Sequence, residues 1–283
     1  MENQYIGDKL DIDLSIDYKE VSIVIKDFIK TYVKNSGCSG IVLGLSGGID
    51  SIVTTILCKE ALGKKNIKCL FLPELTTPKI DIKHYELFIK KFNISSEKKD
   101  ISSIVKELTK NSIIKPDKYA LANMKARARM ILLFEYANMK NYLVCGTSNK
   151  SEILVGYFTK YGDGGVDIMP IGDLYKTQVW ELAKFFKVPK EIISKPPAAG
   201  LWKGQSDEKE LKLSYTQLDK ILAGLERKLD LSDIAKIVNV KKSEVERIKN
   251  LRIESQHKQR AALIPKLGLR TPGYDWRSPI LEG

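Results

Sequence analysis

The chain passes from an apolar run into a glycine turn within one short stretch, Ile41-Val42-Leu43-Gly44-Leu45-Ser46-Gly47-Gly48-Ile49-Asp50-Ser51. The run at 41–45 predicts a buried strand, because it is short, apolar and bounded by turn residues. After the turn, apolar residues such as Ile52, Val53 and Ile56 recur at helical spacing, and Gly63 ends the pattern. A strand that runs directly into a helix opens a strand–helix–strand unit. The stretch therefore predicts an α/β fold.

Helix and strand patterns alternate on both sides of this stretch. The expected helices cover residues 17–34, 49–62, a segment ending near 92, residues 119–138, and a helix that opens after the turn at 147–149. The other expected strands cover 68–73, a short stretch near 98–101, and 142–146. Strands that alternate with helices of this length pair in parallel through crossover helices. The expected fold is a doubly wound parallel sheet with helices on both faces.

The second half of the chain predicts loops followed by helices. Residues 160–172 combine glycines with acidic residues and are expected to form an ordered loop, whereas 196–207 has the proline and glycine content of a lid-like segment. From residue 213 to 268 the pattern is mostly helical. We therefore expect one domain over residues 1–268, with 213–268 as a helical extension, and an irregular tail at 269–283.

Composition and charge narrow the class of protein. With 283 residues and 43% hydrophobic residues, the chain is long enough to bury a substantial core. No apolar run approaches the roughly 18 residues that span a bilayer, and the first residues lack the basic and apolar parts of a signal peptide. A soluble, cytoplasmic protein without a membrane partner is expected. The formal charge of +12 favours anionic partners but does not choose among nucleotides, nucleic acid and acidic lipid.

The cysteines Cys38, Cys58, Cys69 and Cys145 are far apart in the sequence and form no CxxC pair. This spacing gives no sign of a zinc knuckle or of a disulfide framework. We expect reduced thiols that behave as small, buried hydrophobic residues.

The turn after the first strand has the features of an anion-binding site. Gly47 and Gly48 let the backbone approach an anion closely, and the start of the following helix supplies free N–H groups and a positive dipole end. The turn is not the P-loop GxxxxGK(S/T), because Ile49 and Asp50 stand where that loop has its lysine. A carboxylate beside phosphates repels them unless a divalent cation lies between, so Asp50 predicts Mg²⁺ as cofactor.

A second turn falls at the carboxyl end of another expected strand. Gly146 and Thr147 follow the apolar residues at 142–145. In doubly wound sheets, ligands bind outside the carboxyl ends of the strands. The two turns are therefore expected to share one site.

The residues Ser46-Gly47-Gly48-Ile49-Asp50-Ser51 resemble the pyrophosphatase loop of the ATP-pyrophosphatase superfamily, whose members cleave ATP between the α and β phosphates. A more specific resemblance, to the NAD synthetase family, lies in Gly146-Thr147-Ser148-Asn149-Lys150-Ser151-Glu152 and Gly156-Tyr157-Phe158-Thr159-Lys160-Tyr161-Gly162-Asp163-Gly164-Gly165-Val166-Asp167. Further matches are Lys125-Ala126-Arg127-Ala128-Arg129-Met130, Tyr175-Lys176-Thr177-Gln178, Leu201-Trp202-Lys203-Gly204-Gln205-Ser206-Asp207-Glu208 and His257-Lys258. The resemblance covers residues 15–265, nearly the whole chain.

The resemblance implies a set of site residues, matched position by position. The ATP-binding residues would be Gly44, Leu45, Ser46, Gly47, Gly48, Ile49, Asp50, Ser51, Thr147 and Lys176. Asp50 and Lys176 would be catalytic, and Asp50 and Glu152 would hold Mg²⁺. The residues that contact deamido-NAD would be Arg127, Lys160, Asp167, His257 and Lys258. One position departs from the family pattern, since Ala198 stands where many members have a threonine that contacts ATP.

The resemblance also implies the reaction, an ATP-dependent amidation of deamido-NAD to NAD. The carboxylate of deamido-NAD would attack the α-phosphorus of ATP and release pyrophosphate, whose charge Mg²⁺ and Lys176 would neutralise. Ammonia would then displace AMP from the adenylated carboxylate. Relatives that use glutamine carry a separate amide-hydrolysing domain, and the segment before Ser46 is too short for one. Free ammonia is the expected donor, and a separate glutaminase subunit as its source stays open. Members of the family are typically homodimers.

Two alternatives stay open from the sequence. Another ATP-pyrophosphatase, such as a tRNA-modifying enzyme, would suit the charge of +12, although tRNA thiolases generally need paired redox cysteines. A DNA-binding module would suit residues 231–248, which scan as a helix-turn-helix. Glu244, Glu246 and Glu254 in and after its second helix would oppose phosphates, so we favour packing as the explanation and expect no nucleic-acid partner.

Overall fold

The computed structural model describes residues 11–202, 204–260 and 262–271. Its sheet consists of β1 (Gly40–Gly44), β2 (Ile67–Phe71), β3 (Ser96–Lys98) and β4 (Tyr142–Cys145), in the order β3-β2-β1-β4. All neighbouring strands are parallel, and Val42 in β1 pairs with Lys68 in β2 and Val144 in β4. The chain crosses from β1 to β3 on one side and returns to β4 on the other. The predicted doubly wound parallel sheet is confirmed.

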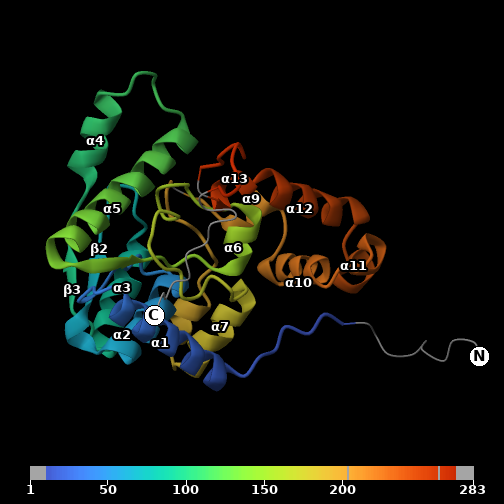
Figure 1. Ribbon diagram of the computed structural model, residues 1–283, viewed down its shortest axis with the longest axis horizontal. Coiled ribbons are helices and arrows are strands. Elements are labelled where there is room, and N and C mark those ends of the chain that lie inside the picture. The colour runs from blue at the N-terminus through green and yellow to red at the C-terminus, as the bar shows by residue number, and fades with distance from the viewer. Residues whose placement is uncertain (1–10, 203, 261, 272–283) are drawn as a thin grey trace, which may run out of the picture.

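Helices cover both faces of the sheet (Figure 1). One face carries α1 (Tyr18–Asn35), α2 (Ile49–Leu62), α3 (Lys79–Lys91) and α7 (Lys176–Phe185), and the other carries α4 (Ser102–Lys110) and α5 (Lys118–Lys140). Side chains alternate between the two sides, since Ile41 and Leu43 enter the first core and Val42 the second. Across the residues that the structure describes, none of the helices combines the length and hydrophobicity needed to cross a bilayer.

A further hydrophobic core lies in the helical extension, to one side of the sheet (Figure 1). It is built by α10 (Tyr215–Glu226), α11 (Leu231–Val238) and α12 (Lys242–Glu254). Ile12, from the segment before α1, is buried in the same core. The apolar residues that made 231–248 scan as a helix-turn-helix, among them Ile234 and Val245, are buried here. Packing therefore accounts for that pattern.

Short helices connect the larger elements. They are η1 (Lys64–Asn66), α6 (Lys150–Val155), α8 (Lys190–Ile193), α9 (Asp207–Leu211) and α13 (Gln256–Gln259). The glycine-rich loop at 160–172 is ordered by hydrogen bonds, as predicted. The Thr159 N–H donates to the Asp163 carboxylate (2.9 Å), and the Gly146 N–H donates to the Ile168 carbonyl (2.8 Å).

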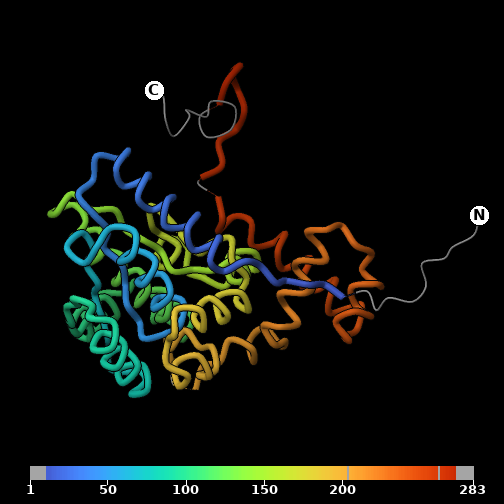
Figure 2. The backbone as a smooth tube through the Cα atoms, turned by 90° about the horizontal axis from the view of Figure 1, so that it is seen from below, coloured from blue at the N-terminus to red at the C-terminus, as the bar shows by residue number. Residues whose placement is uncertain are grey.

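Two regions differ from the sequence prediction. The third strand ends at Lys98 instead of extending near residue 101, because Asp100 accepts a hydrogen bond from the Ser102 N–H (2.7 Å) and the chain turns into α4, a helix that was not predicted. The last described helix ends at Gln259, so the prediction of helix up to residue 268 is wrong. Residues 262–270 are exposed and run away from the body (Figure 2), so they bury no apolar face, and Pro265 disfavours helix before it. Most of the predicted tail, 272–283, lies outside the described residues.

The cysteines are free thiols, and three of them are buried. Cys58 Sγ and Cys145 Sγ lie 3.8 Å apart, a proximity that their sequence spacing did not indicate. Burial raises the pKa of Cys69 to about 12 and that of Cys145 well above its ordinary value, so both remain protonated at neutral pH. The prediction of buried thiols holds for these residues, whereas Cys38 is partly exposed.

Candidate active site

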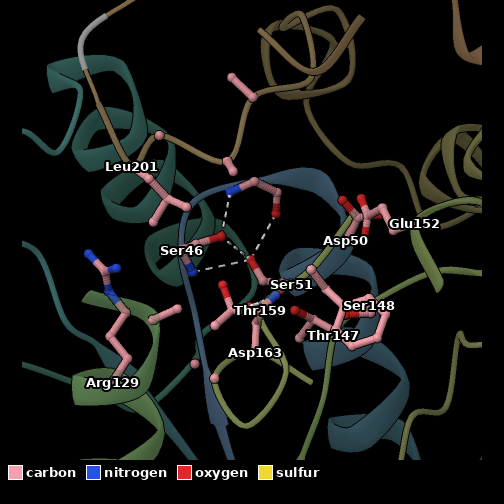
Figure 3. A pocket seen from close by; sticks show the side chains of 18 of the residues that line it. Ser46, Asp50, Ser51, Arg129, Thr147, Ser148, Glu152, Thr159, Asp163 and Leu201 are labelled. Carbon is pink, nitrogen blue, oxygen red and sulfur yellow. Dashed lines mark hydrogen bonds between the residues drawn. The ribbon is translucent and has the colours of Figure 1, made fainter. Parts of the chain in front are cut away.

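A cavity of about 520 Å³ opens at the carboxyl ends of β1, β2 and β4 (Figure 3). Residues 44–46 at the end of β1, 70–73 at the end of β2 and 145–148 at the end of β4 line it. Side chains of α5 and residues 196–202 complete its walls. The turns at Ser46 and Thr147 therefore lie in one cavity, where a doubly wound sheet is expected to bind its ligand.

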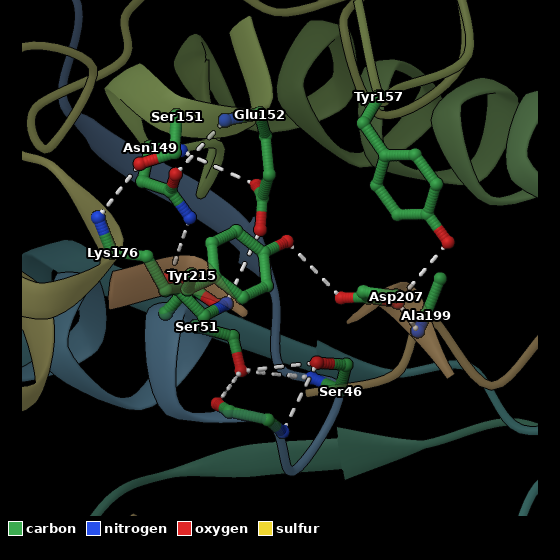
Figure 4. Close-up of polar contacts among 12 residues, drawn as sticks. Ser46, Ser51, Asn149, Ser151, Glu152, Tyr157, Lys176, Ala199, Asp207 and Tyr215 are labelled. Carbon is green, nitrogen blue, oxygen red and sulfur yellow. Dashed lines mark hydrogen bonds and ion pairs between the residues drawn. The ribbon is translucent and has the colours of Figure 1, made fainter. Parts of the chain in front are cut away.

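The turn after β1 is held together by its own serines (Figures 3 and 4). Ser51 Oγ donates to the Gly48 carbonyl (2.8 Å) and accepts from the Ser46 N–H (3.2 Å). Ser46 Oγ accepts from the Gly48 N–H (3.2 Å). Helix α2 then begins at Ile49 without a side-chain cap, so the N–H groups of its first turn are available to an anion. We call the segment from Ser46 to Ser51 the phosphate grip.

Glycine is required at position 47 of the phosphate grip. Its φ of +84° lies in the left-handed region, and a Cβ there would lie 2.3 Å from the Asp81 carbonyl oxygen. The Asp81 side chain pairs with Lys195, the residue just before the wall at 196–202. The phosphate grip, the start of α3 and this wall are therefore in close contact.

Lys176 lies between two carboxylates beside the phosphate grip. Its Nζ is 2.5 Å from Asp50 Oδ2 and 3.2 Å from Glu152 Oε1. Asp50 is in the first turn of α2, and Glu152 is in the first turn of α6, where it forms a capping box with Asn149 (Figure 4). Asn149 Nδ2 also donates to Asp50 Oδ1 (3.0 Å). The three side chains that the sequence assigns to metal binding and catalysis thus lie together.

This cluster gathers three carboxyl groups around one ammonium group. Asp207, which is 4% exposed, adds a further carboxylate close to Lys176. Burial raises the pKa of Glu152 to about 8, opposed by the Lys176 ammonium and reinforced by the Asp50 carboxylate. Burial on its own lowers the pKa of Lys176, but Asp50 and Glu152 outweigh it and raise that pKa above its ordinary value. Lys176 is therefore a cation, and the site can accept further positive charge.

The donor set fits Mg²⁺. This ion keeps several waters and is usually bound by one or two carboxylates together with substrate phosphates. Asp50 and Glu152 supply such a pair at the phosphate grip. Within the described parts of the chain, no group of three or more His, Cys, Asp or Glu side chains is arranged to hold a metal ion. The residues present therefore fit an ion whose coordination shell is completed by substrate phosphates and water.

The main chain at Lys176 is fixed by the helical extension. Ser151 Oγ accepts from the Lys176 N–H (2.9 Å) and donates to Asp219 (2.5 Å). The Thr177 N–H and hydroxyl both donate to the same carboxylate, at 2.8 Å each. Burial raises the pKa of Asp219 to about 6, so it is an anion at neutral pH, which is favourable at the start of α7. Sequence reasoning missed Asp219, because its role depends on contacts between distant segments.

The residues assigned to deamido-NAD are only partly brought together. Lys258 lines the cavity, and its Nζ donates to the Gly156 carbonyl (2.7 Å) and the Phe158 carbonyl (3.1 Å). Arg127, Lys160 and His257 lie outside the residues that line the cavity but contact one another. Arg127 Nη2 donates to the Lys160 carbonyl (3.2 Å), and Lys160 Nζ donates to the His257 carbonyl (2.6 Å).

Asp167 has a different environment. Its Oδ2 accepts a hydrogen bond from the Val144 N–H (2.7 Å), and its own N–H donates to the Val144 carbonyl (2.9 Å). The side chain therefore caps the edge of β4, and the structure does not place it among the residues that line the cavity. These two hydrogen bonds hold the segment that follows Asp163 against β4.

Comparison with known proteins identifies the family. The model of the NAD synthase family matches residues 21–262. The chain belongs to the NAD synthase family. The NH3-dependent NAD(+) synthetase of Sulfolobus acidocaldarius is 41% identical over 279 residues, which cover 98% of this chain and 98% of that protein. The NH3-dependent NAD(+) synthetase of Methanocaldococcus jannaschii is 43% identical over 252 residues, covering 88% of this chain and 97% of that protein.

Solved structures of the family agree with this fold. The NMN synthetase from Francisella tularensis has a TM-score of 0.79 and 32% identity, and the match covers 89% of this chain and 100% of that one. The NH3-dependent NAD synthetase from Campylobacter jejuni has a TM-score of 0.75 and 34% identity, with the same coverage. The α/β fold predicted from the alternation of strands and helices is therefore confirmed.

This NAD synthase family member has cavity residues that sequence reasoning did not assign. Asp207 accepts from the Tyr157 hydroxyl (3.1 Å) and from the Ala199 N–H (3.1 Å) (Figure 4). Arg129 Nε donates to the Leu72 carbonyl (2.9 Å), and its side chain lines the cavity (Figure 3). Asp207 and Arg129 both fall within runs that resemble the family, so the signal was present. Tyr157 and Leu72 lie in segments far from Asp207 and Arg129 in the sequence, so these two contacts could not be predicted from it.

Proposed function

We propose that this NAD synthase family member is a cytoplasmic enzyme that converts deamido-NAD to NAD, with ATP and ammonia as co-substrates and Mg²⁺ as cofactor. The observation that carries the proposal is the direct contact of Asp50, Lys176 and Glu152 beside the phosphate grip, in a chain of this family. Relatives such as the NH3-dependent NAD(+) synthetase of Sulfolobus acidocaldarius support ammonia as the nitrogen donor.

In the first half-reaction, a carboxylate oxygen of deamido-NAD attacks the α-phosphorus of ATP, and the bond from that phosphorus to the pyrophosphate oxygen breaks. The phosphate grip binds the departing phosphates through backbone N–H groups at the start of α2. The Lys176 ammonium stabilises the charge that develops on pyrophosphate. Asp50 and Glu152 would hold Mg²⁺, which when bound supplies Lewis-acid neutralisation of phosphate charge. Asp219 and Ser151 keep the start of α7 in place, so that Lys176 is oriented before substrates arrive.

In the second half-reaction, the nitrogen of ammonia attacks the acyl carbon of the adenylate, AMP leaves, and the nitrogen loses a proton. Water competes for the same acyl carbon, so the cavity must exclude it. Residues 196–202 and the loop at 156–159 wall the cavity. Lys258 fixes that loop through the carbonyls of Gly156 and Phe158. These walls are the elements that protect the intermediate.

A direct assay tests this function. Protein incubated with Mg²⁺, ATP, ammonium and deamido-NAD should produce NAD and AMP in equal amounts, measured by liquid chromatography, and chelation of Mg²⁺ should stop both. A parallel reaction replaces deamido-NAD by nicotinate mononucleotide, because one solved relative is an NMN synthetase. Another replaces it by tRNA, the substrate of the alternative function. AMP formation that depends on either of these and not on deamido-NAD would reject the proposal.

We also propose that two copies of the chain associate. Ile131 and Met139 are 56% and 74% exposed on α5, about two helical turns apart and so on the same side of the helix. Apolar side chains exposed together favour a protein contact. Gel filtration with light scattering should therefore give about twice the 32.0 kDa of one chain. A mass of one chain at micromolar concentration would reject the dimer.

A further inference from the structure

A buried ammonium group on α5 joins three segments that are far apart in the sequence. The side chain of Lys125 is 4% exposed, and it pairs with Glu74, which is 5% exposed, at 2.8 Å. Lys125 Nζ also donates to Thr76 Oγ1 (2.8 Å) and to the Leu201 carbonyl (2.9 Å). Its three N–H groups are therefore directed to the connection after β2 and to the wall at 196–202.

The buried ammonium group of Lys125 requires partners for its charge and for its protons. An ammonium group this deeply buried is tolerated only when its charge is paired and its protons are bonded, and Glu74 and Thr76 meet most of that need. The Leu201 carbonyl is the third partner, and it is the only one of the three that belongs to the wall. A buried charge that donates to a main-chain carbonyl forms a strong hydrogen bond. This hydrogen bond therefore stabilises the position of the wall.

The wall depends on such contacts because it has no regular structure of its own. Residues 196–202 contain neither helix nor strand, yet all of them line the cavity. The Ala199 N–H donates to Asp207 and the Leu201 N–H to Gln205 Oε1, both within the same part of the chain. By contrast, Lys125 ties the wall directly to α5. Leu201 and Ser46 of the phosphate grip line the same cavity (Figure 3).

We propose that Lys125 is a positioning residue that holds the wall at 196–202 closed over the phosphate grip, so that the adenylate meets ammonia before it meets water. The inference deepens the proposed function and rests on it. Without the bond to the Leu201 carbonyl, the wall moves away more often and the adenylate is hydrolysed. Each hydrolysis consumes ATP and releases AMP without forming NAD. The quantity that reports the role of Lys125 is thus the ratio of NAD to AMP.

The test must separate holding the wall from supporting the fold. Lys125→Met removes the ammonium and keeps the apolar stem, but it leaves Glu74 as a buried, unpaired carboxylate. The double variant Lys125→Met with Glu74→Gln removes that penalty and restores neither charge nor the bond to Leu201. Val105→Ala is the matched control, because it weakens the core between α4 and α5 without touching the wall. For each protein, unfolding temperature, NAD per AMP, and hydrogen exchange of the unliganded wall peptide are measured.

Both Lys125 variants should form about tenfold less NAD per AMP and show about tenfold faster exchange at the wall, the factor expected for one lost charge-assisted hydrogen bond. The double variant should regain much of the unfolding temperature lost in the single variant. Val105→Ala should have a lower unfolding temperature but form as much NAD per AMP as wild type. If the double variant regains both the wild-type ratio of NAD to AMP and slow exchange at the wall, the inference is overturned, because Lys125 would then only stabilise the fold. If wild-type protein makes no NAD from deamido-NAD, the proposed function fails, and the exchange comparison still decides whether Lys125 holds the wall.

Discussion

Asp50→Asn should lower the rate of AMP and NAD formation by about 10³-fold, the upper range for loss of one preorganised electrostatic group. The amide keeps the size of the side chain but loses the charge that pairs with Lys176 at 2.5 Å and that would hold Mg²⁺. Because Asp50 lies in the first turn of α2 beside the phosphate grip, the loss falls on the step that releases pyrophosphate. Steady-state rates at saturating ATP and varied Mg²⁺ measure it.

The fold should survive this change. The Asp50 side chain is 17% exposed and belongs to none of the three hydrophobic cores, so the thermal transition should shift by only a few degrees. Asp27→Asn, an exposed change on α1, is the control and should leave both rate and transition unchanged. Full activity of a folded Asp50→Asn protein would remove Asp50 from the mechanism and with it the assignment of the phosphate grip.

The parts of the fold that were predictable are those set by local pattern. The run at 41–45 is buried because both of its neighbours in the sheet and the helices on both faces cover it, and such a strand reads as continuous apolar sequence. Gly47 and Gly48 mark the turn because backbone geometry there excludes a side chain at position 47. Motif position then placed Glu152 and Lys176 in the same site, which their mutual contacts support.

The parts that were not predictable depend on contacts between distant segments. Asn149 reaches Asp50 across 99 positions, and Lys125 reaches Leu201 across 76. Periodic patterns in the sequence do not predict contacts between residues this far apart. Asp167 shows that a match to the family motif does not by itself place a residue in the cavity. Its carboxylate accepts a hydrogen bond from the Val144 N–H at the edge of the sheet. The end of the last helix was missed because helical composition continues past Gln259 while the apolar partner surface does not.

Lys176→Met should reduce kcat by about 10³-fold, because the developing charge on pyrophosphate loses its fixed cation. It should also lower stability by about 3 kcal/mol, since Asp50 and Glu152 lose the ammonium that pairs with both. Single-turnover rates with prebound ATP, taken well below the thermal transition, separate the chemical step from unfolding. Lys184→Met is the control on the same helix, where the side chain is 57% exposed, and it should change neither rate nor stability.

Comparison of the two site variants separates their roles. Asp50→Asn removes a group proposed to hold Mg²⁺, so its residual activity should require a higher Mg²⁺ concentration than wild type. Lys176→Met keeps both Asp50 and Glu152, and loss of the competing ammonium leaves these carboxylates free for a cation, so its Mg²⁺ requirement should not rise. A rise in Lys176→Met equal to that in Asp50→Asn would mean that the lysine only orients the carboxylates. An unchanged requirement with a large loss of kcat would place Lys176 on the leaving pyrophosphate itself.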